Sequence, residues 1–154
     1  MDDHTLVRQG LRSALQAYPN IQVVGEAIDG EWAVLTAARL QPTVVVMDIN
    51  MSKMDGITAT RLIKTQHPQI AVLGLSVDLK DYQIYAMQKA GAFEVLKKDN
   101  AVADLYGAIQ RAVAAVQPVL ILEETPSPKQ DPAESESLDN PALPESMPMK
   151  EPKI

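Results

Sequence analysis

Polar side chains standing at the ends of short, largely apolar runs are the feature that most constrains the fold of this chain. The runs have the length of β-strands and cover residues 43–47, 71–75 and 93–97. The residues that follow them are Asp48, Ser76 and Lys98. In an open α/β sheet the carboxyl ends of parallel strands line one crevice, so side chains far apart in sequence meet there. The pattern therefore predicts one site built from three strand ends.

The predicted site is rich in carboxylates, because the pair Asp2-Asp3 is expected to join Asp48 there. Clustered carboxylates repel one another and favour a hard cation with oxygen ligands, most simply Mg²⁺. The hydroxyl of Ser76 and the ammonium of Lys98 are suited to the oxygens of a phosphoryl group. The residue types therefore indicate chemistry on phosphate with the help of a divalent cation.

The fold class follows from the order of the patterns along the chain. Strand-length apolar segments alternate with segments of helical period, which is typical of βαβ units and a parallel sheet. The expected strands lie near residues 21–25, 43–47, 71–75 and 93–97. The expected helices lie near residues 6–15, 31–40, 57–66, 80–90 and 105–116. We therefore predict an α/β domain with helices on both faces of the sheet.

Four stretches carry a resemblance to a known family. They are Asp2-Asp3-His4, residues 25–30, the loop from Asp48 to Gly56, and Ala90-Gly91-Ala92 followed by Lys98. In order and spacing, residues 1 to about 117 resemble the receiver domain of bacterial two-component response regulators. The resemblance implies a flavodoxin-like three-layer sandwich with a parallel sheet of strand order 2-1-3-4-5.

The resemblance also implies roles for individual residues. Asp48 would be the phosphoacceptor, taking a phosphoryl group from a histidine kinase or phosphotransfer protein. Mg²⁺ would be held by Asp2, Asp3, Asp48 and the backbone carbonyl of Asn50, and the phosphoryl oxygens would be contacted by Ser76 and Lys98. The protein would be a signalling phosphoprotein and not an enzyme.

Simpler interpretations of the same residues stay open at this point. Asp2 and Asp3 could cap the first helix, where short acidic side chains satisfy free N–H groups. Ser76 could bond its own local backbone at the strand end. Only one of Lys97 and Lys98 is expected to face the site, because side chains alternate along a strand. His4 lacks the ligand spacing of a zinc site and is interpreted as part of the start of the first helix.

One element of the family pattern is missing. Receivers begin with an apolar strand that leads into the acidic pair, whereas here Met1 directly precedes Asp2. One hypothesis is that the real protein extends upstream of Met1. Residues 119–122, followed by Glu123 and Glu124, repeat the pattern of the lost strand. We therefore also expect residues 119–122 to fill the empty central slot, between the strands near Val23 and Val45.

Charge divides the chain into two parts. Residues 1–122 hold 11 Lys and Arg against 12 Asp and Glu, whereas residues 123–154 hold 3 against 8 and seven of the 11 prolines. Such a tail cannot bury enough apolar surface to offset chain entropy. We predict a receiver domain at 1–122 and a disordered acidic tail at 123–154. An acidic tail also argues against direct binding of nucleic acid, which needs a basic face.

The amino-acid composition excludes several other classes of function. The chain has no Cys, which excludes thiol catalysis and cysteine-ligated metal, and no apolar run of membrane-spanning length. We therefore expect a cytoplasmic protein that does not bind membranes, and a homodimer stays open. Ser52, Val77 and Val95 depart from the usual receiver residues, so a degenerate receiver that serves only as an interaction module is one alternative. An aspartate-nucleophile phosphohydrolase is another, although Asn50 stands where that class needs a second acid.

Overall fold

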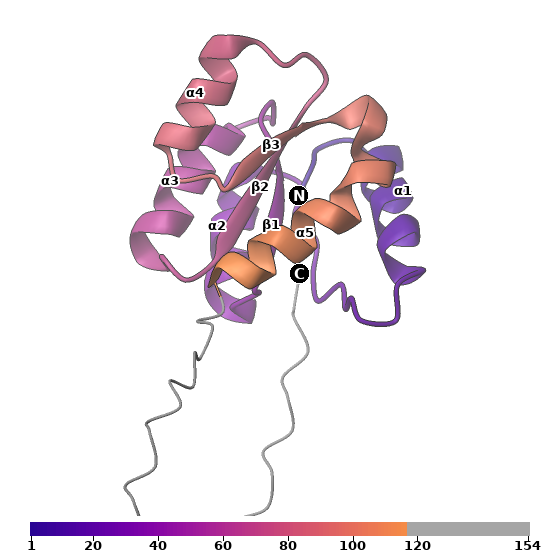
Figure 1. The fold of residues 1–154 in the computed structure, drawn as a ribbon. Coiled ribbons are helices and arrows are strands. Elements are labelled where there is room, and N and C mark those ends of the chain that lie inside the picture. The colour runs from indigo at the N-terminus through magenta and orange to yellow at the C-terminus, as the bar shows by residue number, and fades with distance from the viewer. Residues whose placement is uncertain (117–154) are drawn as a thin grey trace, which may run out of the picture. The chain divides into compact units, whose positions relative to one another are not determined.

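The computed structural model of the chain describes residues 1–116. Five α-helices surround a parallel sheet of three strands in the order β1-β2-β3 (Figure 1). The strands are β1 (Val44–Asp48), β2 (Ala71–Ser76) and β3 (Glu94–Lys97). The helices are α1 (Thr5–Gln16), α2 (Gly30–Leu40), α3 (Gly56–Gln66), α4 (Asp81–Lys89) and α5 (Ala101–Val116), with a short 3-10 turn, η1 (Lys98–Asn100), after β3. The α/β class and the three-layer arrangement are confirmed.

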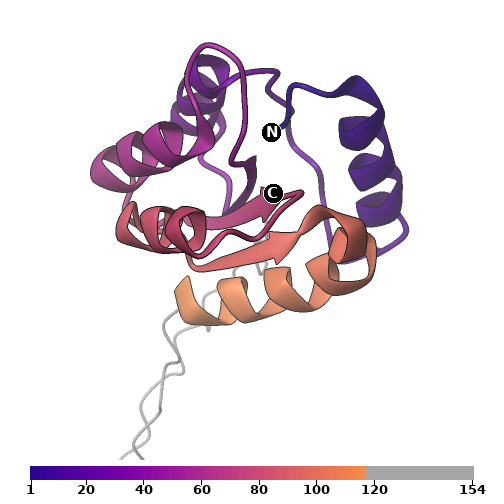
Figure 2. The same ribbon diagram turned by 90° about the horizontal axis from the view of Figure 1, so that it is seen from above.

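The alternation of side chains along β1 divides the core between the two faces of the sheet. Val44 and Val46 pack with residues of α1 and α5, whereas Val45 and Met47 pack with residues of α2 and α3. Figure 2 shows the same division, with α5 beneath the sheet and α2 and α3 on the other side. Because both faces are covered, every residue of β1 and β2 is buried.

Local signals explain why the helices begin where they do. Asp29 caps α2 by accepting a hydrogen bond from the Trp32 N–H at 2.9 Å, and Asp55 caps α3 by accepting one from the Thr58 N–H at 2.8 Å. Both aspartates satisfy N–H groups that have no partner within the helix. The predicted helix and strand boundaries agree with the structure to within a few residues, with the exception of one strand.

The predicted strand at 21–25 is wrong: these residues form no strand within the described part of the chain. In the family's strand order this segment would pair with the first strand alone. A strand needs a neighbour to take up its backbone hydrogen bonds, and the apolar pattern of residues 21–25 cannot supply one.

The chain enters the sheet beside β1 at Met1. Its amino group donates to the Val46 carbonyl at 2.7 Å, and its carbonyl accepts from the Asp48 N–H at 2.9 Å. On the other side, the Asp2 N–H donates to the Ala27 carbonyl at 3.2 Å. Met1 and Asp2 thus make the contacts of the last residues of a central parallel strand. This placement brings Asp2 to the end of β1.

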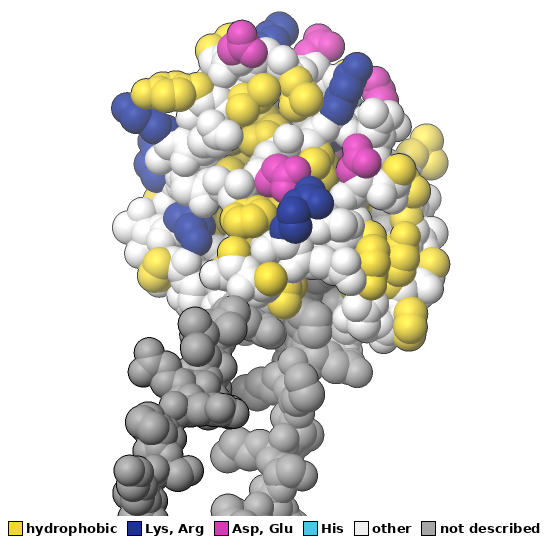
Figure 3. Space-filling model, viewed as in Figure 1, with side chains coloured by type: hydrophobic (Ala, Val, Ile, Leu, Met, Phe, Trp, Pro, Cys, Tyr) yellow, Lys and Arg dark blue, Asp and Glu magenta, His cyan; other side chains and the backbone are white. Residues whose placement is uncertain are grey.

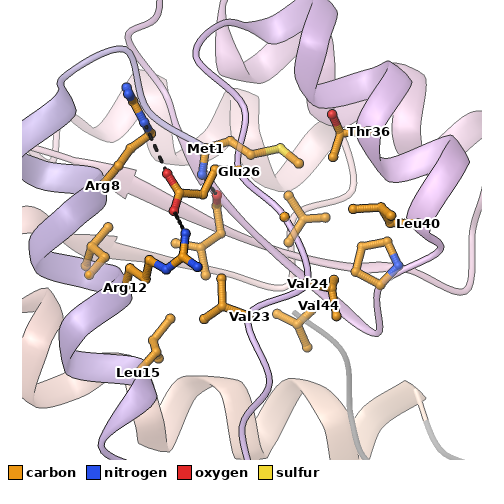
Figure 4. Close-up of a pocket in the computed structure, with 15 residues that line it drawn as sticks. Met1, Arg8, Arg12, Leu15, Val23, Val24, Glu26, Thr36, Leu40 and Val44 are labelled. Atoms are coloured by element: carbon orange, nitrogen blue, oxygen red, sulfur yellow. Dashed lines mark hydrogen bonds and ion pairs between the residues drawn. The ribbon is translucent and has the colours of Figure 1, made fainter.

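A groove continues from Met1 along the edge of β1 (Figure 4). Its lining is mostly apolar and includes Val23, Val24, Leu40 and Val44, with the Arg8–Glu26 ion pair at its rim. The groove marks the central slot identified from the sequence. The expected occupant, residues 119–122, and the expected tail at 123–154 lie outside the described residues.

The outer surface combines charged and apolar side chains. Figure 3, which looks onto α4, β3 and α5, shows apolar side chains between charged ones. The large exposed apolar residues include Tyr82 and Tyr85 on α4 and Val102 on α5. Within residues 1–116 no helix is long and apolar enough to cross a membrane.

Substituting two glycines by alanine is expected to change the stability of the domain in opposite directions. A methyl group on Gly56 would overlap the carbonyl oxygen of Asp48, whereas one on Gly10, an exposed position within α1, would meet nothing within 4 Å. We expect Gly56→Ala to lower the free energy of unfolding by about 1–3 kcal/mol, because the chain must shift at the end of β1. Gly10→Ala is expected to raise it by about 0.5–1 kcal/mol, because alanine favours the helix. Urea unfolding of both variants measures these changes, and equal effects would contradict the close packing of Gly56 against the Asp48 carbonyl.

Candidate functional site

The structure brings Asp48 and Lys98, at the ends of β1 and β3, into contact together with Asp2. Asp48 is the last residue of β1, Ser76 is the last residue of β2, and Lys98 directly follows β3. Lys98 Nζ lies 2.7 Å from Asp2 Oδ2 and 2.8 Å from Asp48 Oδ2. The side chains of Asp2 and Asp48 are 1% and 2% exposed, and that of Lys98 is 11% exposed. One buried ammonium group therefore joins two buried carboxylates from distant parts of the chain.

Lys98, and not Lys97, faces the site. The Lys97 side chain is 47% exposed and pairs with Asp99 at 3.3 Å. β3 ends at Lys97, and Lys98 opens the 3-10 turn that leads into α5. The direction predicted from strand alternation is therefore found in the structure, although Lys98 lies one residue beyond the strand itself.

Burial and charge shift the acidity of the three groups in different directions. Burial raises the pKa of the Asp48 carboxyl, and the hydrogen bond from Lys98 offsets only part of this effect. Burial also acts on Asp2, but hydrogen bonds from Lys98 and from the His4 N–H outweigh it and lower the pKa of that carboxyl. Burial alone would lower the pKa of Lys98, yet its two carboxylate partners raise it. Lys98 is therefore held in its charged form beside Asp2 and Asp48.

Further carboxylate oxygen atoms lie within reach of a cation. Ligand atoms of Asp2, Asp3, His4 and Asp48 all lie within 4.8 Å of one another. Asp3 Oδ1 is buried and lies 2.8 Å from His4 Nδ1. The Oδ2 atoms of Asp2 and Asp48 are buried too, and their negative charge is balanced by Lys98 Nζ, which lies 2.7 Å from the first and 2.8 Å from the second. The excess of acidic oxygens over positive charge fits a hard divalent cation.

Ser52 shows how the loop after β1 contributes to this cluster. Its N–H donates to Asp3 Oδ2 at 3.2 Å. Receivers usually carry proline at this position, and proline has no N–H to donate. The departure from the family pattern therefore gives Asp3 one additional hydrogen bond.

Asn50 and Ser76 make local contacts. The Asn50 N–H donates to Asp48 Oδ1 at 3.2 Å, and the Asn50 side-chain oxygen accepts from Gln83 Nε2 at 3.3 Å. The Ser76 hydroxyl is buried and donates to the Asp78 carbonyl at 2.6 Å. This contact is the local backbone bond that the sequence left open as an alternative role for Ser76. The neighbouring Val77 is 56% exposed.

Two features of the site were missed by the sequence analysis. His4 precedes α1, as expected, but its Nδ1 lies 2.8 Å from Asp3 Oδ1 and 3.2 Å from Asp2 Oδ1. A histidine directly after two acids was the signal that could have indicated this contact. Glu26 pairs with Arg12 at 2.7 Å and with Arg8 at 3.6 Å, which ties α1 to the segment before α2. Arg8 also donates to the Asp2 carbonyl at 2.8 Å and so steadies the acidic end of the chain.

Comparisons with known proteins agree with this geometry. A family model described as the response regulator receiver domain matches residues 1–110. The transcriptional regulatory protein LiaR of Bacillus subtilis (strain 168) is 42% identical over 114 residues, which are 73% of this chain and 53% of LiaR. The response regulator protein VraR of Staphylococcus aureus (strain Mu3) is 37% identical over 111 residues, 72% of this chain and 53% of VraR. The chain thus spans about half the length of these curated relatives.

Solved structures show the same likeness in three dimensions. A two-component response regulator of the LuxR family from Aurantimonas sp. SI85-9A1 matches with a TM-score of 0.71 and 31% identity, over 74% of this chain and 81% of that one. The response regulator domain of Thermotoga maritima CheB matches with a TM-score of 0.69 and 27% identity, over 73% and 92% of the two chains. The strand-end site, the family model and these relatives agree, and the chain therefore belongs to the receiver-domain family of two-component response regulators.

Proposed function

We propose that this receiver domain accepts a phosphoryl group on Asp48 from the phosphohistidine of a histidine kinase or phosphotransfer protein. The observation that carries the proposal is the buried Lys98 ammonium between Asp2 and Asp48. A positive charge fixed beside a carboxylate attracts the phosphoryl oxygens and offsets charge that develops during transfer. The site therefore has a nucleophile and an electrostatic stabiliser in contact before any donor binds.

Each residue of the site has a role in the proposed transfer. A carboxylate oxygen of Asp48 attacks phosphorus, the P–N bond to the donor imidazole breaks, and an acyl phosphate forms on Asp48. The Asn50 N–H, 3.2 Å from Asp48 Oδ1, orients the carboxylate. Lys98 would follow the phosphoryl oxygens, and the Ser76 hydroxyl would exchange the Asp78 carbonyl for one of them.

The proposed metal site is formed by Asp2, Asp3, Asp48 and the carbonyl of Asn50, with Mg²⁺ as the cation. The excess of acidic oxygens at Asp2, Asp3 and Asp48 over the one ammonium of Lys98 supports this choice. When bound, Mg²⁺ neutralises the charge of the phosphoryl oxygens. The chain's own contribution is to hold Asp2 and Asp3 in place, through the backbone contacts of Met1 and Asp2 and the Ser52 N–H.

The wider role of the protein is part of the proposal. Relatives such as LiaR are described as transcriptional regulators, and this chain covers only about half of their length. We propose a receiver at residues 1–122 followed by an acidic, proline-rich segment, acting in the cytoplasm without direct nucleic-acid or membrane binding. A stand-alone receiver and part of a longer regulator both fit this assignment.

The proposed function can be tested with a small phosphodonor. The purified chain is incubated with acetyl phosphate with and without Mg²⁺, and the mass of the intact protein is measured. We expect one added phosphoryl group that depends on Mg²⁺ and is removed by hydroxylamine, which cleaves acyl phosphates. No added mass in the presence of Mg²⁺ would contradict phosphotransfer and favour a receiver that serves only as an interaction module.

A further inference from the structure

Helix α2 buries its small side chains and exposes its large apolar ones. On its inner side Gly30, Ala33 and Ala37 are buried in the domain. On its outer side Trp32 is 53% exposed and Leu35 is 60% exposed. A helix on the surface of a domain normally has the opposite arrangement, with apolar residues inside and polar residues outside. Because exposed apolar patches commonly mark interaction sites, the outer side of α2 is a candidate surface for a partner.

Opposite charges stand at the two ends of this exposed surface. Glu31 lies in the first turn of α2 and Arg39 in its last turn, both are exposed, and Leu35 is four residues from each. Residues spaced by four form one ridge along a helix, and we call Glu31, Leu35 and Arg39 the α2 ridge. Within residues 1–116 neither charged side chain forms an ion pair. The α2 ridge therefore has a negative end, an apolar centre and a positive end.

The charge order along the α2 ridge is complementary to that of a second copy running in the opposite direction. The commonest packing of helices in globular proteins sets ridges of residues spaced by four against each other. In such an antiparallel pair centred on Leu35, Glu31 of each copy meets Arg39 of the other. A symmetric dimer contact needs this reciprocity, in which residue i meets j and j meets i. A parallel pair would instead bring like charges together at both ends.

We infer that the outer side of α2 is a self-association surface, on which a second copy of this chain packs its own α2 in the opposite direction. Leu35 of both copies lies at the centre, Trp32 borders it, and the pairs of Glu31 with Arg39 close the two ends. Tryptophan is among the residue types that contribute most to binding at interface centres. One helix from each copy covers less than the about 1,600 Å² of a standard interface, so the dimer is weak and depends on protein concentration.

The first test measures the mass of the unchanged chain by sedimentation equilibrium over a series of concentrations. Low salt is used, because salt screens exposed charges. We expect the average mass to rise from monomer toward dimer. Trp32 is the only tryptophan of the chain, so its fluorescence should shift to shorter wavelengths over the same concentrations as its ring is covered. Leu35→Glu should keep the chain monomeric, because two negative charges would then meet at the centre of the contact.

Charge reversal tests the direction of packing. Glu31→Arg alone and Arg39→Glu alone should each weaken dimerisation by at least about fivefold, because both end pairs change from attraction to repulsion. An equal mixture of these two variants should dimerise about as well as the unchanged chain, because opposite charges again meet at both ends. The double variant Glu31→Arg/Arg39→Glu should also dimerise, and it keeps the net charge of the unchanged chain.

Lys89→Glu is the matched control for Arg39→Glu. Lys89 lies in the last turn of α4, as Arg39 does in the last turn of α2, and both substitutions change the net charge equally. The Lys89 ammonium lies 5.4 Å from the centre of the Tyr85 ring, away from the α2 ridge. Dimerisation of this variant should equal that of the unchanged chain.

Several outcomes would overturn the inference. One is an unchanged chain that stays monomeric at every concentration, and another is a dimer that Leu35→Glu leaves intact. Equal weakening by Lys89→Glu and Arg39→Glu would place the contact elsewhere or reduce it to an effect of net charge. Failure of the mixed single variants to recover would show that the substitutions damage α2 and do not break an antiparallel contact. Phosphorylation with acetyl phosphate is a separate measurement, so the proposed function can stand or fail independently.

Discussion

Asp48→Asn is expected to abolish phosphorylation by a small phosphodonor. An amide is a poor nucleophile and cannot form an acyl phosphate, whereas its size and its oxygen keep the contact with the Asn50 N–H. The carboxylates nearest to it are Asp2, which pairs with Lys98, and Asp3, which accepts from Ser52. Neither is expected to replace Asp48. Intact-protein mass after treatment with acetyl phosphate and Mg²⁺ measures the effect.

Asp99→Asn is the matched control for this substitution. Asp99 lies next to Lys98 in the sequence, but its side chain is 64% exposed and pairs with Lys97. We expect it to be phosphorylated as the unchanged chain is. Circular dichroism should show that both variants are folded. A folded Asp48→Asn variant that still takes up a hydroxylamine-sensitive phosphoryl group would place the acceptor elsewhere.

Lys98→Ala is expected to lower the free energy of unfolding by about 3–5 kcal/mol, the usual cost of removing one partner from a buried ion pair. Two carboxylates that are 1% and 2% exposed would lose the positive charge between them. Phosphorylation should also fall, because the charge that attracts the phosphoryl oxygens is gone. Urea unfolding and phosphorylation by acetyl phosphate measure the two effects.

Lys97→Ala is the control for Lys98→Ala, because it removes the same kind of side chain from an exposed ion pair. Its effect on unfolding should stay within about 0.5 kcal/mol. Saturating Mg²⁺ should restore part of the stability lost in Lys98→Ala, since a cation that binds only the folded chain shifts the equilibrium toward it. Equal losses in the two variants, or no response to Mg²⁺, would mean that Lys98 does not balance the charge of the acidic site.

Most of the sheet and its flanking helices could be predicted because their signals are local. An apolar run that fills β1 and β2 has the composition of a strand covered on both faces, and Asp29 and Asp55 stand where helix caps are expected. The convergence of Asp48 and Lys98 followed from the same reasoning, since parallel strands end at one edge of a sheet.

The strand predicted at 21–25 shows where local reasoning stops. Its apolar residues do become part of a packed region, for Ile21 is buried and Val23 packs against the core. Strand formation, however, depends on hydrogen bonds to the backbone of an adjacent strand, and the residue pattern of 21–25 does not show whether such a strand is present. The packing of these residues could therefore be predicted from the sequence, and their hydrogen bonding could not.

The details of the site were harder to predict than its composition. The Ser76 hydroxyl has one donor proton, and whether this bonds Asp78 or a ligand depends on backbone geometry beyond β2. The direction of the His4 ring depends on how α1 begins relative to Asp2 and Asp3. Such choices are set by tertiary placement, which residue type and spacing do not encode.

The position of Met1 has a practical consequence for attaching labels and fusion partners. Its amino group donates to the Val46 carbonyl, and burial lowers the pKa of this amine from 8.0 to about 6. The lowered pKa leaves more of this amine uncharged near neutral pH than of the surface lysines, whereas its bond to the Val46 carbonyl must open before a reagent can attack it. Any residue joined ahead of Met1 would continue along β1 into the groove beside Val23 and Val44, and not into solvent. A peptide fused at the N-terminus would therefore place side chains in this groove, and its sequence would change the stability of the domain.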